Sequence, residues 1–419
     1  MTTLVTERRE TLITICEEKK SMMDEIKINF GKNQKSFKVI KKPHPPICVN
    51  SKKEMHGWWD CGFQRECTSE RLLLNPLNGC TFNCVFCYAN SFPYQYFKTF
   101  RERGIVTVFE DFDKVVANQL DDLSIASCGY LSPVTDPFQP LDLKYKLSRK
   151  IVLEFVKRNL PVEVVTKGEI PKSVISMLKK QEHSFGQVSI LTLKEELRRK
   201  FMSSGASTKV LIRNIERLSN NDVFVVARID PIIPNLTDSR DDLEDLIKTL
   251  SDAGASHIVT SCLDIPLSIE HEILERFERV KPGIRKIYSR LFTEKRKVYK
   301  HANIRYKKRL FKMVKEICMK NEVTMALCME FEVFRGSVVG LNREFMISKN
   351  CEGIDTPIYI RKGEVFEPVD CLGNCLHCLS AICGIEELCG GGSWRLGDYR
   401  RWSREVSSRE KQTILNGFS

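Results

Sequence analysis

Short apolar runs alternate with amphipathic segments between residues 71 and 280. Runs typical of buried strands cover residues 71–77, 124–131, 162–166, 187–193, 223–229 and 257–261. Between them, apolar residues recur at helical spacing, as at Leu143, Leu147, Ile151 and Phe155 and again at Leu243, Leu246, Ile247 and Leu250. The pattern therefore predicts strands and helices that follow one another about six times.

Strands that alternate with helices form a parallel sheet, because each helix carries the chain back across the sheet. We therefore expect an α/β fold, a partial (β/α)6 barrel of the TIM type, over residues 68–280. In such a barrel the functional side chains lie at the carboxyl ends of the strands and in the loops that follow.

Two further segments flank the predicted barrel. Residues 1–67 are polar and rich in lysine, and we expect an N-terminal extension there. Residues 281–419 combine a basic helical segment, with a helix at 304–321, and a cysteine-rich C-terminal domain. Short strands are expected at 322–327 and 356–360 within this last segment.

The composition is that of an ordinary globular protein, with 42% hydrophobic and 29% charged residues among 419. There is no run of about 18 apolar residues, so we expect no membrane span. The N-terminus lacks the apolar segment of a secretory signal, and we expect a cytoplasmic protein. Because disulfides are rare in that reducing compartment, the 17 cysteines favour metal binding.

Three cysteines follow the first predicted strand. Cys80, Cys84 and Cys87 have the spacing C-x3-C-x2-C, and Phe86 precedes the third. Thiolates suit iron–sulfur clusters and zinc, but a structural zinc site uses four ligands. Three cysteines on a [4Fe–4S] cluster leave one iron without a protein ligand. The motif therefore predicts an iron–sulfur cluster with an open coordination site.

This motif resembles the signature of the radical S-adenosylmethionine (SAM) superfamily. The resemblance implies that the open iron binds the amino and carboxylate groups of SAM. An electron from the cluster then cleaves SAM to a 5′-deoxyadenosyl radical, which abstracts a hydrogen atom from a substrate. A reductant such as flavodoxin or ferredoxin is the implied partner.

Further segments resemble the spore photoproduct lyase-like branch of the superfamily, also described as DNA repair photolyase-like. They occur in the order of that branch across residues 71–262, at 75–80, 132–140, 164–167, 188–193 and 228–239. The resemblance implies five SAM contacts, which are Tyr88, Thr135, Asp136, Lys167 and Ser189. Lys167 ends the third predicted strand and suits the SAM carboxylate as a point cation, and Ser189 on the fourth predicted strand suits the ribose.

One position departs from photoproduct lyase itself. That enzyme has a hydrogen-donating cysteine where this chain has Pro133, directly before Val134. Cys128, five residues earlier, is either a substitute catalytic residue or an ordinary strand residue, and the second is favoured because buried cysteine is usually inert. The departure argues against photoproduct repair as the reaction.

Five cysteines lie within nineteen residues of the C-terminal segment, at Cys371, Cys375, Cys378, Cys383 and Cys389. Such clustering predicts a second metal centre. An auxiliary [4Fe–4S] cluster is favoured over structural zinc, for which His377 is a further candidate ligand. Cys328 or Cys351 is an alternative source of the fourth ligand, and the sequence leaves this choice open.

The net charge of +12 is concentrated in one window. Residues 281–320 hold 15 lysines and arginines against two acids, Glu294 and Glu316, a balance of +13. Aromatic residues are interleaved with these charges, at Tyr288, Phe292, Tyr299 and Tyr306. The window is either a solvated helix face or a surface that binds nucleic acid or another polyanion.

Three functions are compatible with these patterns. The first is a radical SAM enzyme that reductively cleaves SAM and acts on a nucleic acid, a peptide or a small metabolite. The second is a transferase of the same fold that moves the aminocarboxypropyl or methyl group of SAM. The third is a non-catalytic iron–sulfur or zinc protein that binds nucleic acid. The residues suited to SAM binding argue against the third, because nucleic-acid binding alone requires no SAM site.

Overall fold

Seven parallel strands form the central sheet of the computed structural model, which describes residues 23–30, 33–43, 71–92, 95–372, 378–379, 381, 383–384 and 386. Their order across the sheet is β15-β11-β10-β9-β8-β7-β3, and every neighbouring pair is parallel. The strands are β3 (Leu72–Leu74), β7 (Gly129–Leu131), β8 (Val162–Thr166), β9 (Phe185–Ser189), β10 (Phe224–Ile232), β11 (His257–Cys262) and β15 (Thr324–Leu327). The parallel α/β fold expected from the sequence is confirmed.

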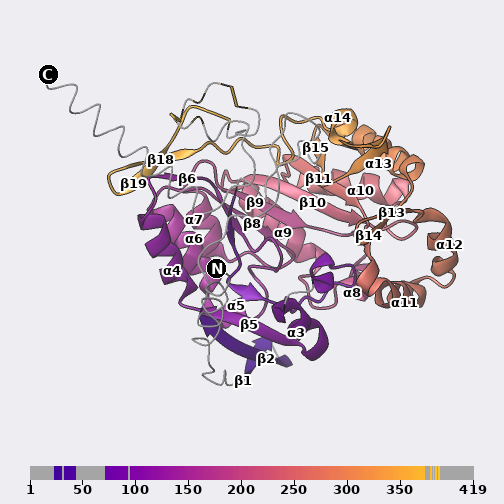
Figure 1. Ribbon diagram of the computed structural model, residues 1–419, viewed down its shortest axis with the longest axis horizontal. Coiled ribbons are helices and arrows are strands. Elements are labelled where there is room, and N and C mark those ends of the chain that lie inside the picture. Colours follow the sequence, from indigo (N-terminus) through magenta and orange to yellow (C-terminus); the bar gives the residue numbers. More distant parts are fainter. Residues whose placement is uncertain are drawn as a thin grey trace, which may run out of the picture.

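Helices between the strands cover the outer face of the sheet (Figure 1). They are α4 (Phe112–Asp121), α6 (Leu147–Lys157), α7 (Lys172–Leu178), α9 (Thr208–Ser219), α10 (Arg240–Asp252) and α13 (Ile304–Lys320). Three further helices lie to the right of the sheet in Figure 1, namely α8 (Glu195–Phe201), α11 (Glu270–Val280) and α12 (Ile284–Leu291). Val162 and Val164, alternate residues of β8, join these helices in one apolar core. Ser207 and Ser239 cap α9 and α10 by accepting a backbone N–H of the first turn, which fixes where each helix begins.

The strand β15 extends the sheet beyond the six strands expected. It pairs in parallel with β11, from His257 opposite Thr324 to Thr260 opposite Leu327. The helix before it, α13, confirms the helix expected at 304–321. The sheet therefore continues past residue 280, because α13 and β15 repeat the helix–strand pattern once more.

Smaller sheets flank the barrel. One has the order β1-β2-β5-β4, with β1 (Met23–Phe30), β2 (Asn33–Pro43), β4 (Leu77–Asn78) and β5 (Ile105–Glu110). A second joins β6 (Ile125–Ala126) to the hairpin β18 (Tyr359–Lys362) and β19 (Val365–Pro368). In Figure 1 the first lies at the bottom and the second at the upper left. The N-terminal extension thus includes a hairpin that pairs with β5.

The remaining short elements connect these parts. They are η2 (Tyr88–Ser91), α3 (Gln95–Arg103), α5 (Asp142–Tyr145), β12 (Ile265–Pro266), η3 (Leu267–Ile269), β13 (Glu294–Arg296), β14 (Tyr299–His301), β16 (Phe331–Phe334), β17 (Ser337–Gly340) and α14 (Asn342–Phe345). The segments β12, β14 and β13 form a small sheet that follows β11.

An apolar layer lies inside the sheet near the amino ends of the strands. Cys128, Phe185, Val226 and Val259 form this cluster, which is separate from the helix-covered core. Because none of these four side chains is more than 2% exposed, the layer closes the inside of the barrel at this level.

Residues 351–354 close the amino end of the barrel together with Arg71 and His257, and we call this set the amino-end plug. The Arg71 guanidinium lies 2.5 Å from the Glu352 carboxylate, and both side chains are buried. The ring of His257 bonds Thr324 Oγ1 at 2.8 Å and the Cys351 carbonyl at 3.1 Å. The functional groups are therefore expected at the opposite, carboxyl end.

Candidate active site

The loop after β3 leaves the sheet through a turn that only glycine fits. The strand β4 pairs with β5, and Gly79 follows with a φ of +93°. A Cβ at this position would lie 2.7 Å from the ring of Phe100, so a larger residue would both strain the backbone and displace that ring. The turn places the cysteine motif at the carboxyl end of β3.

Two tight turns bring the three cysteines of the motif together. Asn83 N donates to Cys80 O, and Cys87 N donates to Cys84 O, both at 3.1 Å. Phe86, directly before the third cysteine, is buried in the main core and anchors the loop. The cysteine loop is therefore held compact by its own backbone hydrogen bonds and by the buried ring of Phe86.

Burial raises the pKa of all three thiols. The pKa of Cys84 rises to about 12, and that of Cys80 is raised by burial and then by the Asp136 carboxylate. The Lys167 ammonium opposes this effect and lowers the pKa of Cys84 and Cys87. Three thiolates at this place therefore need additional positive charge, which iron supplies when a cluster is bound.

The three thiols fit a [4Fe–4S] cluster. They lie close enough for Cys84 and Cys87 to raise the pKa of Cys80. Within the described ranges, however, no group of three or more His, Cys, Asp or Glu side chains is placed to hold one metal ion. In a [4Fe–4S] cluster each cysteine binds a different iron, so three cysteines need not converge on one point.

Asp136 and Lys167 join the ends of β7 and β8. The Asp136 carboxylate accepts from Phe138 N at 2.9 Å, Thr166 Oγ1 at 2.7 Å and Lys167 N at 2.6 Å. Burial raises the pKa of Asp136 to about 6, although these three hydrogen bonds lower it. The carboxylate is thus engaged with the protein itself, whereas the Lys167 ammonium has no hydrogen-bond or ion-pair partner among the described residues.

Two hydroxyls at the end of β7 are buried without a hydrogen-bond partner in the described structure, Ser132 Oγ and Thr135 Oγ1. Ser132 also has a φ of +59°, a strained backbone conformation for a residue with a side chain. Ser189 ends β9, is 2% exposed and lies in register with Arg228 of β10. Buried polar groups that lack a protein partner are typical of a ligand site.

Tyr88 fastens the cysteine loop to the loop after β7. Its hydroxyl donates to Pro133 O at 2.8 Å, and its ring packs edge-on against Phe92. The side chain stays 45% exposed. The structure therefore places Tyr88, Thr135, Asp136, Lys167 and Ser189 at the carboxyl ends of three neighbouring strands, beside the cysteine loop.

A belt of polar side chains crosses the inside of the sheet, and the sequence analysis did not single it out. Gln187 donates to Glu163 at 3.2 Å and accepts from Arg228 at 2.9 Å. Arg228 also lies 2.5 Å from Asp230, which accepts from Ser261 at 2.5 Å. The sequence does contain a signal for this belt, namely polar residues two positions apart within apolar strands. Such residues lie on the same face of the sheet, because alternate residues of a strand share a face.

The two inward cysteines lie at different levels. Cys128 belongs to the apolar layer and is 0% exposed. Cys328, directly after β15, is half-buried and accepts a hydrogen bond from Arg228 at 3.3 Å. Cys328 also packs against the apolar layer, so it lies where that layer meets the polar belt. The structure supports the interpretation of Cys128 as an ordinary buried residue.

The cysteine-rich tail is described only in part. Cys371 and Cys383 pack against the main core, and Cys378 is half-buried. Cys375, His377 and Cys389 lie outside the described residues. No metal site is present in the described portion of the chain, so a second centre stays a prediction.

Some of the cations in the basic window at 281–320 are neutralised in the structure by acids that lie elsewhere in the sequence. Four of its cations pair with acids from outside it, in the pairs Lys300–Glu270, Lys307–Glu330, Lys308–Glu332 and Lys320–Glu244. Lys307 is 1% exposed. Tyr288 and Phe292 are buried as well, so they are unavailable for stacking on a partner.

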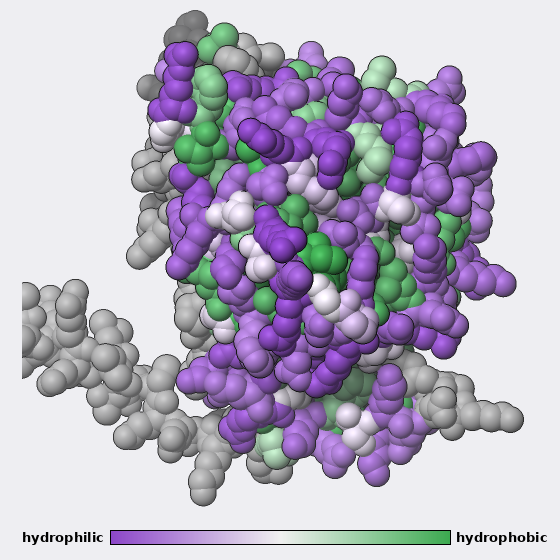
Figure 2. All heavy atoms as spheres, turned by 90° about the vertical axis from the view of Figure 1, so that its right-hand side faces the viewer, coloured by the Kyte–Doolittle hydropathy of each residue, from purple (hydrophilic) through white to green (hydrophobic). Residues whose placement is uncertain are grey.

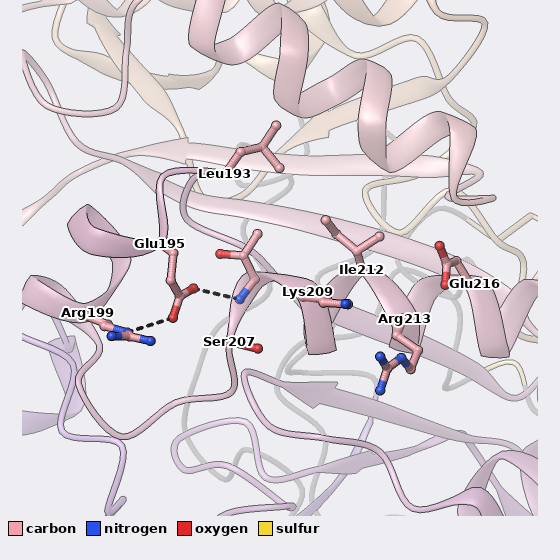
Figure 3. Close-up of a pocket in the computed structure, with 9 residues that line it drawn as sticks. Leu193, Glu195, Arg199, Ser207, Lys209, Ile212, Arg213 and Glu216 are labelled. Carbon is pink, nitrogen blue, oxygen red and sulfur yellow. Dashed lines mark hydrogen bonds and ion pairs between the residues drawn. The ribbon is translucent and has the colours of Figure 1, made fainter.

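One hollow of the described surface lies away from the cysteine loop. It has a volume of about 530 Å³ and is bordered by α8 and α9 (Figure 3). Glu195 bonds Arg199 and the backbone of Thr208 there, while Lys209 and Arg213 line the α9 side. Its acids and bases offset one another, and none of the predicted site residues lines it. The strand ends remain the candidate active site.

The chain is similar to known radical SAM proteins. Residues 74–250 match the model of the radical SAM superfamily. A radical SAM Nalpha-GlyT isomerase of Pseudomonas phage M6 is 25% identical over 401 residues, which cover 90% of this chain and 81% of that protein. Solved structures with a similar fold include spore photoproduct lyase with bound dinucleoside spore photoproduct (TM-score 0.46, 12% identity, 61% of this chain and 75% of that chain). Streptococcus suis SuiB with its precursor peptide is another (TM-score 0.40, 13% identity, 62% and 49%).

Proposed function

We propose that Cys80, Cys84 and Cys87 hold a [4Fe–4S] cluster and that SAM binds beside it at the strand ends, because residues 74–250 match the model of the radical SAM superfamily. When bound, the cluster supplies the electron that cleaves SAM, and the resulting radical abstracts a hydrogen atom from the substrate. The observation that carries the proposal is the Lys167 ammonium beside the cysteine loop, close enough to lower the pKa of Cys84 and Cys87.

The residues of the strand ends would hold SAM. Lys167 offers a cation without a protein partner in the described structure to the SAM carboxylate. Thr135 offers a buried hydroxyl, and Ser189 offers another on the next strand but one. Tyr88 is suited to flank the adenine, since its ring is exposed at the cysteine loop. Asp136 would act mainly by fixing the backbone of Lys167.

Anaerobic reconstitution tests this proposal. Protein loaded with iron and sulfide is reduced in the presence of SAM, and the nucleoside products are separated. We expect 5′-deoxyadenosine from the parent protein and none after Cys80, Cys84 and Cys87 are replaced together by alanine. A matched control replaces the buried cysteines Cys262 and Cys318, which lie outside the motif. Methylthioadenosine as the product would instead support aminocarboxypropyl transfer, and cleavage by the triple variant would refute the assignment.

The relative that spans most of the chain is named an isomerase, and we propose a radical isomerisation as the first reaction to test. In an isomerisation the abstracted hydrogen atom is replaced by one hydrogen atom, either the same atom or one from an exchangeable group, so substrate and product have the same composition. Incubation in deuterated water distinguishes return of the same atom from transfer of one from a solvent-exchangeable group. The substrate class is a nucleic acid, a peptide or a small metabolite, and methyl transfer is the alternative outcome.

A polyanionic partner is proposed for the exposed part of the basic window. Four exposed cations of α12 and the β13–β14 hairpin have no acidic partner in the described structure, namely Lys286, Arg290, Lys295 and Lys297. The face that includes α12 is mostly hydrophilic, with small and scattered hydrophobic areas (Figure 2). The β14 residue Tyr299 lies close enough to Cys87 and Ser91 to be affected by both, so this surface adjoins the cysteine loop.

Salt-dependent binding of DNA and RNA tests the partner. Replacing Lys286, Arg290 and Lys295 by glutamine should weaken binding and reduce the slope of log K against log salt by about 0.7–0.9 per lost phosphate contact. Replacing Lys114, Lys157 and Lys248, which pair with nearby acids, makes the same charge change as a control. Equal losses in both variants would mean that only net charge matters.

A second metal centre in the tail is proposed on Cys371, Cys375, Cys378, Cys383 and Cys389. Anaerobic protein should contain about eight irons per chain for a second [4Fe–4S] cluster and about four for zinc or an empty tail. Alanine at Cys371 and Cys378 should remove only the additional metal.

A flavodoxin or ferredoxin is the proposed reductant. No helix among the described residues is long and apolar enough to cross a membrane.

A further inference from the structure

Gln139 holds the backbone on both sides of the first cysteine. Its side chain is 0% exposed, and its Oε1 accepts from Thr81 N at 3.0 Å and from Thr81 Oγ1 at 3.1 Å. Its Nε2 donates to Gly79 O at 3.2 Å. Because a backbone N–H only donates and a carbonyl only accepts, these partners fix the orientation of the amide.

The same amide is connected to the strand that carries Lys167. Nε2 of Gln139 also reaches Asp136 O at 3.4 Å, and the Asp136 carboxylate accepts from Lys167 N at 2.6 Å. Two buried side chains therefore join residues 79–81 of the cysteine loop to the end of β8. In the described structure, the backbone of residues 79–81 makes its hydrogen bonds outside the cysteine loop only through Gln139.

We propose that Gln139 is a positioning residue that sets the Cys80 ligand at a fixed place relative to Lys167. The inference rests on the proposed function, in which Cys80 binds the cluster and Lys167 binds SAM. Groups that orient a metal ligand without touching the metal commonly change metal affinity when they are replaced. Without the amide, the Gly79–Thr81 backbone loses its connection to Asp136, and Cys80 becomes free to shift relative to Lys167.

Three substitutions separate the donor from the acceptor. Gln139→Leu removes both functions of the amide at similar size. Gln139→Glu keeps the acceptor for Thr81 but loses the donor to Gly79 and Asp136. Thr81→Val removes only the Oγ1 bond and leaves the backbone bond. We expect cluster binding to weaken in the order Gln139→Leu, Gln139→Glu, Thr81→Val.

The control is a buried glutamine far from the cluster motif. Gln181 is 3% exposed and donates to Tyr359 Oη at 2.6 Å and to Asn159 O at 3.3 Å. Gln181→Leu therefore removes a comparable buried amide without touching the cysteine loop. Any effect common to Gln181→Leu and Gln139→Leu measures general destabilisation.

The readouts do not depend on turnover. Reconstituted full-length protein is exposed to an iron chelator, and the rate of iron loss is measured. A second measurement records the electron paramagnetic resonance spectrum of the reduced cluster with and without SAM. For Gln139→Leu we expect iron loss about 10- to 100-fold faster than in the parent and a smaller spectral change on SAM addition. Gln181→Leu should match the parent in both.

The outcomes decide between positioning and simple packing. A parent-like rate of iron loss and a parent-like SAM response in Gln139→Leu would overturn the inference. If that variant fails to fold, Gln139→Glu decides by the same two measurements. A parent protein that binds a cluster but cleaves no SAM would defeat the proposed function, while the effect of Gln139 on iron loss would still be measurable.

Discussion

The two ends of the barrel differ in the hydrogen bonding of their buried polar groups. At the amino end, Arg71 pairs with Glu352, and both ring nitrogens of His257 are bonded. At the carboxyl end, the Lys167 ammonium and the hydroxyls of Ser132 and Thr135 lack protein partners among the described residues. Both ends carry charged and polar side chains, so composition does not distinguish them. The difference lies in the Lys167 ammonium and the two hydroxyls, which have no hydrogen-bond partner among the described residues.

This contrast assigns stability to one end and ligand binding to the other. Polar groups bonded to each other in a closed interior contribute to the uniqueness and stability of the fold. Polar groups buried without a partner cost stability until a ligand bonds them. Replacing a residue of the amino-end plug should therefore change stability, and replacing a residue of the carboxyl end should change ligand binding.

The largest effect is expected from Arg71→Met. The substitution removes the Arg71 guanidinium from the Glu352 carboxylate, which stays buried with 4% of its side chain exposed. Breaking one partner of a buried ion pair costs about 3–5 kcal/mol. The free energy of unfolding, measured with urea, should fall by about this amount, while the spectrum of the reconstituted cluster stays unchanged.

The double variant Arg71→Met with Glu352→Leu checks the cause. Because it removes both charges, it should recover most of the lost stability. Equal stability of the single and double variants would contradict the role of the ion pair. A change in the cluster spectrum of either variant would contradict the separation of the two ends.

A somewhat smaller effect is expected from the pH dependence at His257. Burial lowers the pKa of His257 to about 4, with the Arg228 charge lowering it further and the Cys351 carbonyl and Glu352 raising it. Between pH 6.5 and 4 the unfolded state binds a proton at His257 that the native state does not bind. The contribution of His257 to the free energy of unfolding is therefore fully present above pH 6.5 and is lost as the pH falls toward 4. The difference is on the order of 3 kcal/mol.

Replacing His257 by asparagine tests this dependence. The parent protein should lose stability between pH 6.5 and 4 with a slope of up to about 1.4 kcal/mol per pH unit. The variant should be less stable at neutral pH and should show a flatter profile in that window. Parallel profiles would show that other groups carry the acid sensitivity.

At the carboxyl end, Lys167→Met should affect SAM binding rather than folding. Removing a cation that would bond the SAM carboxylate costs about 1.5–3 kcal/mol, or roughly 10- to 150-fold in affinity. The free energy of unfolding should change by less than about 0.5 kcal/mol, because the ammonium has no partner in the described structure to lose. Equilibrium dialysis with labelled SAM measures the first quantity and urea unfolding the second.

The sequence predicted the strand ends better than the interior between them. Local patterns located the cysteine motif, Lys167 and the helix at 304–321, because each depends on residues near in the chain. The amino-end plug depends on Arg71 meeting Glu352, which are 281 positions apart. Lys307 likewise occupies a buried position on α13 only because Glu330 meets it there. No local sequence pattern predicts such pairs.

The polar belt shows an intermediate case. Arg228 and Asp230 stand two apart in an apolar strand, which indicates a common face. Periodicity cannot tell which face of the sheet is the inner one. That choice follows from helices on the outside, so Gln187, Arg228 and Asp230 became site candidates only once the topology was known.

The smallest effect concerns the two inward cysteines, which differ in level rather than in chemistry. A brief pulse of iodoacetamide on native, iron-free, reduced protein, followed by peptide mass mapping, compares them. Cys328 is half-buried near the carboxyl end, so it should react at least about tenfold faster than Cys128, which needs local opening of the apolar layer. The fully enclosed Cys318 serves as the matched control and should react as slowly as Cys128. Rapid labelling of Cys128 would mean that the apolar layer opens readily to solvent, and the closed amino end would then contribute less to stability than Arg71→Met and the His257 variant assume.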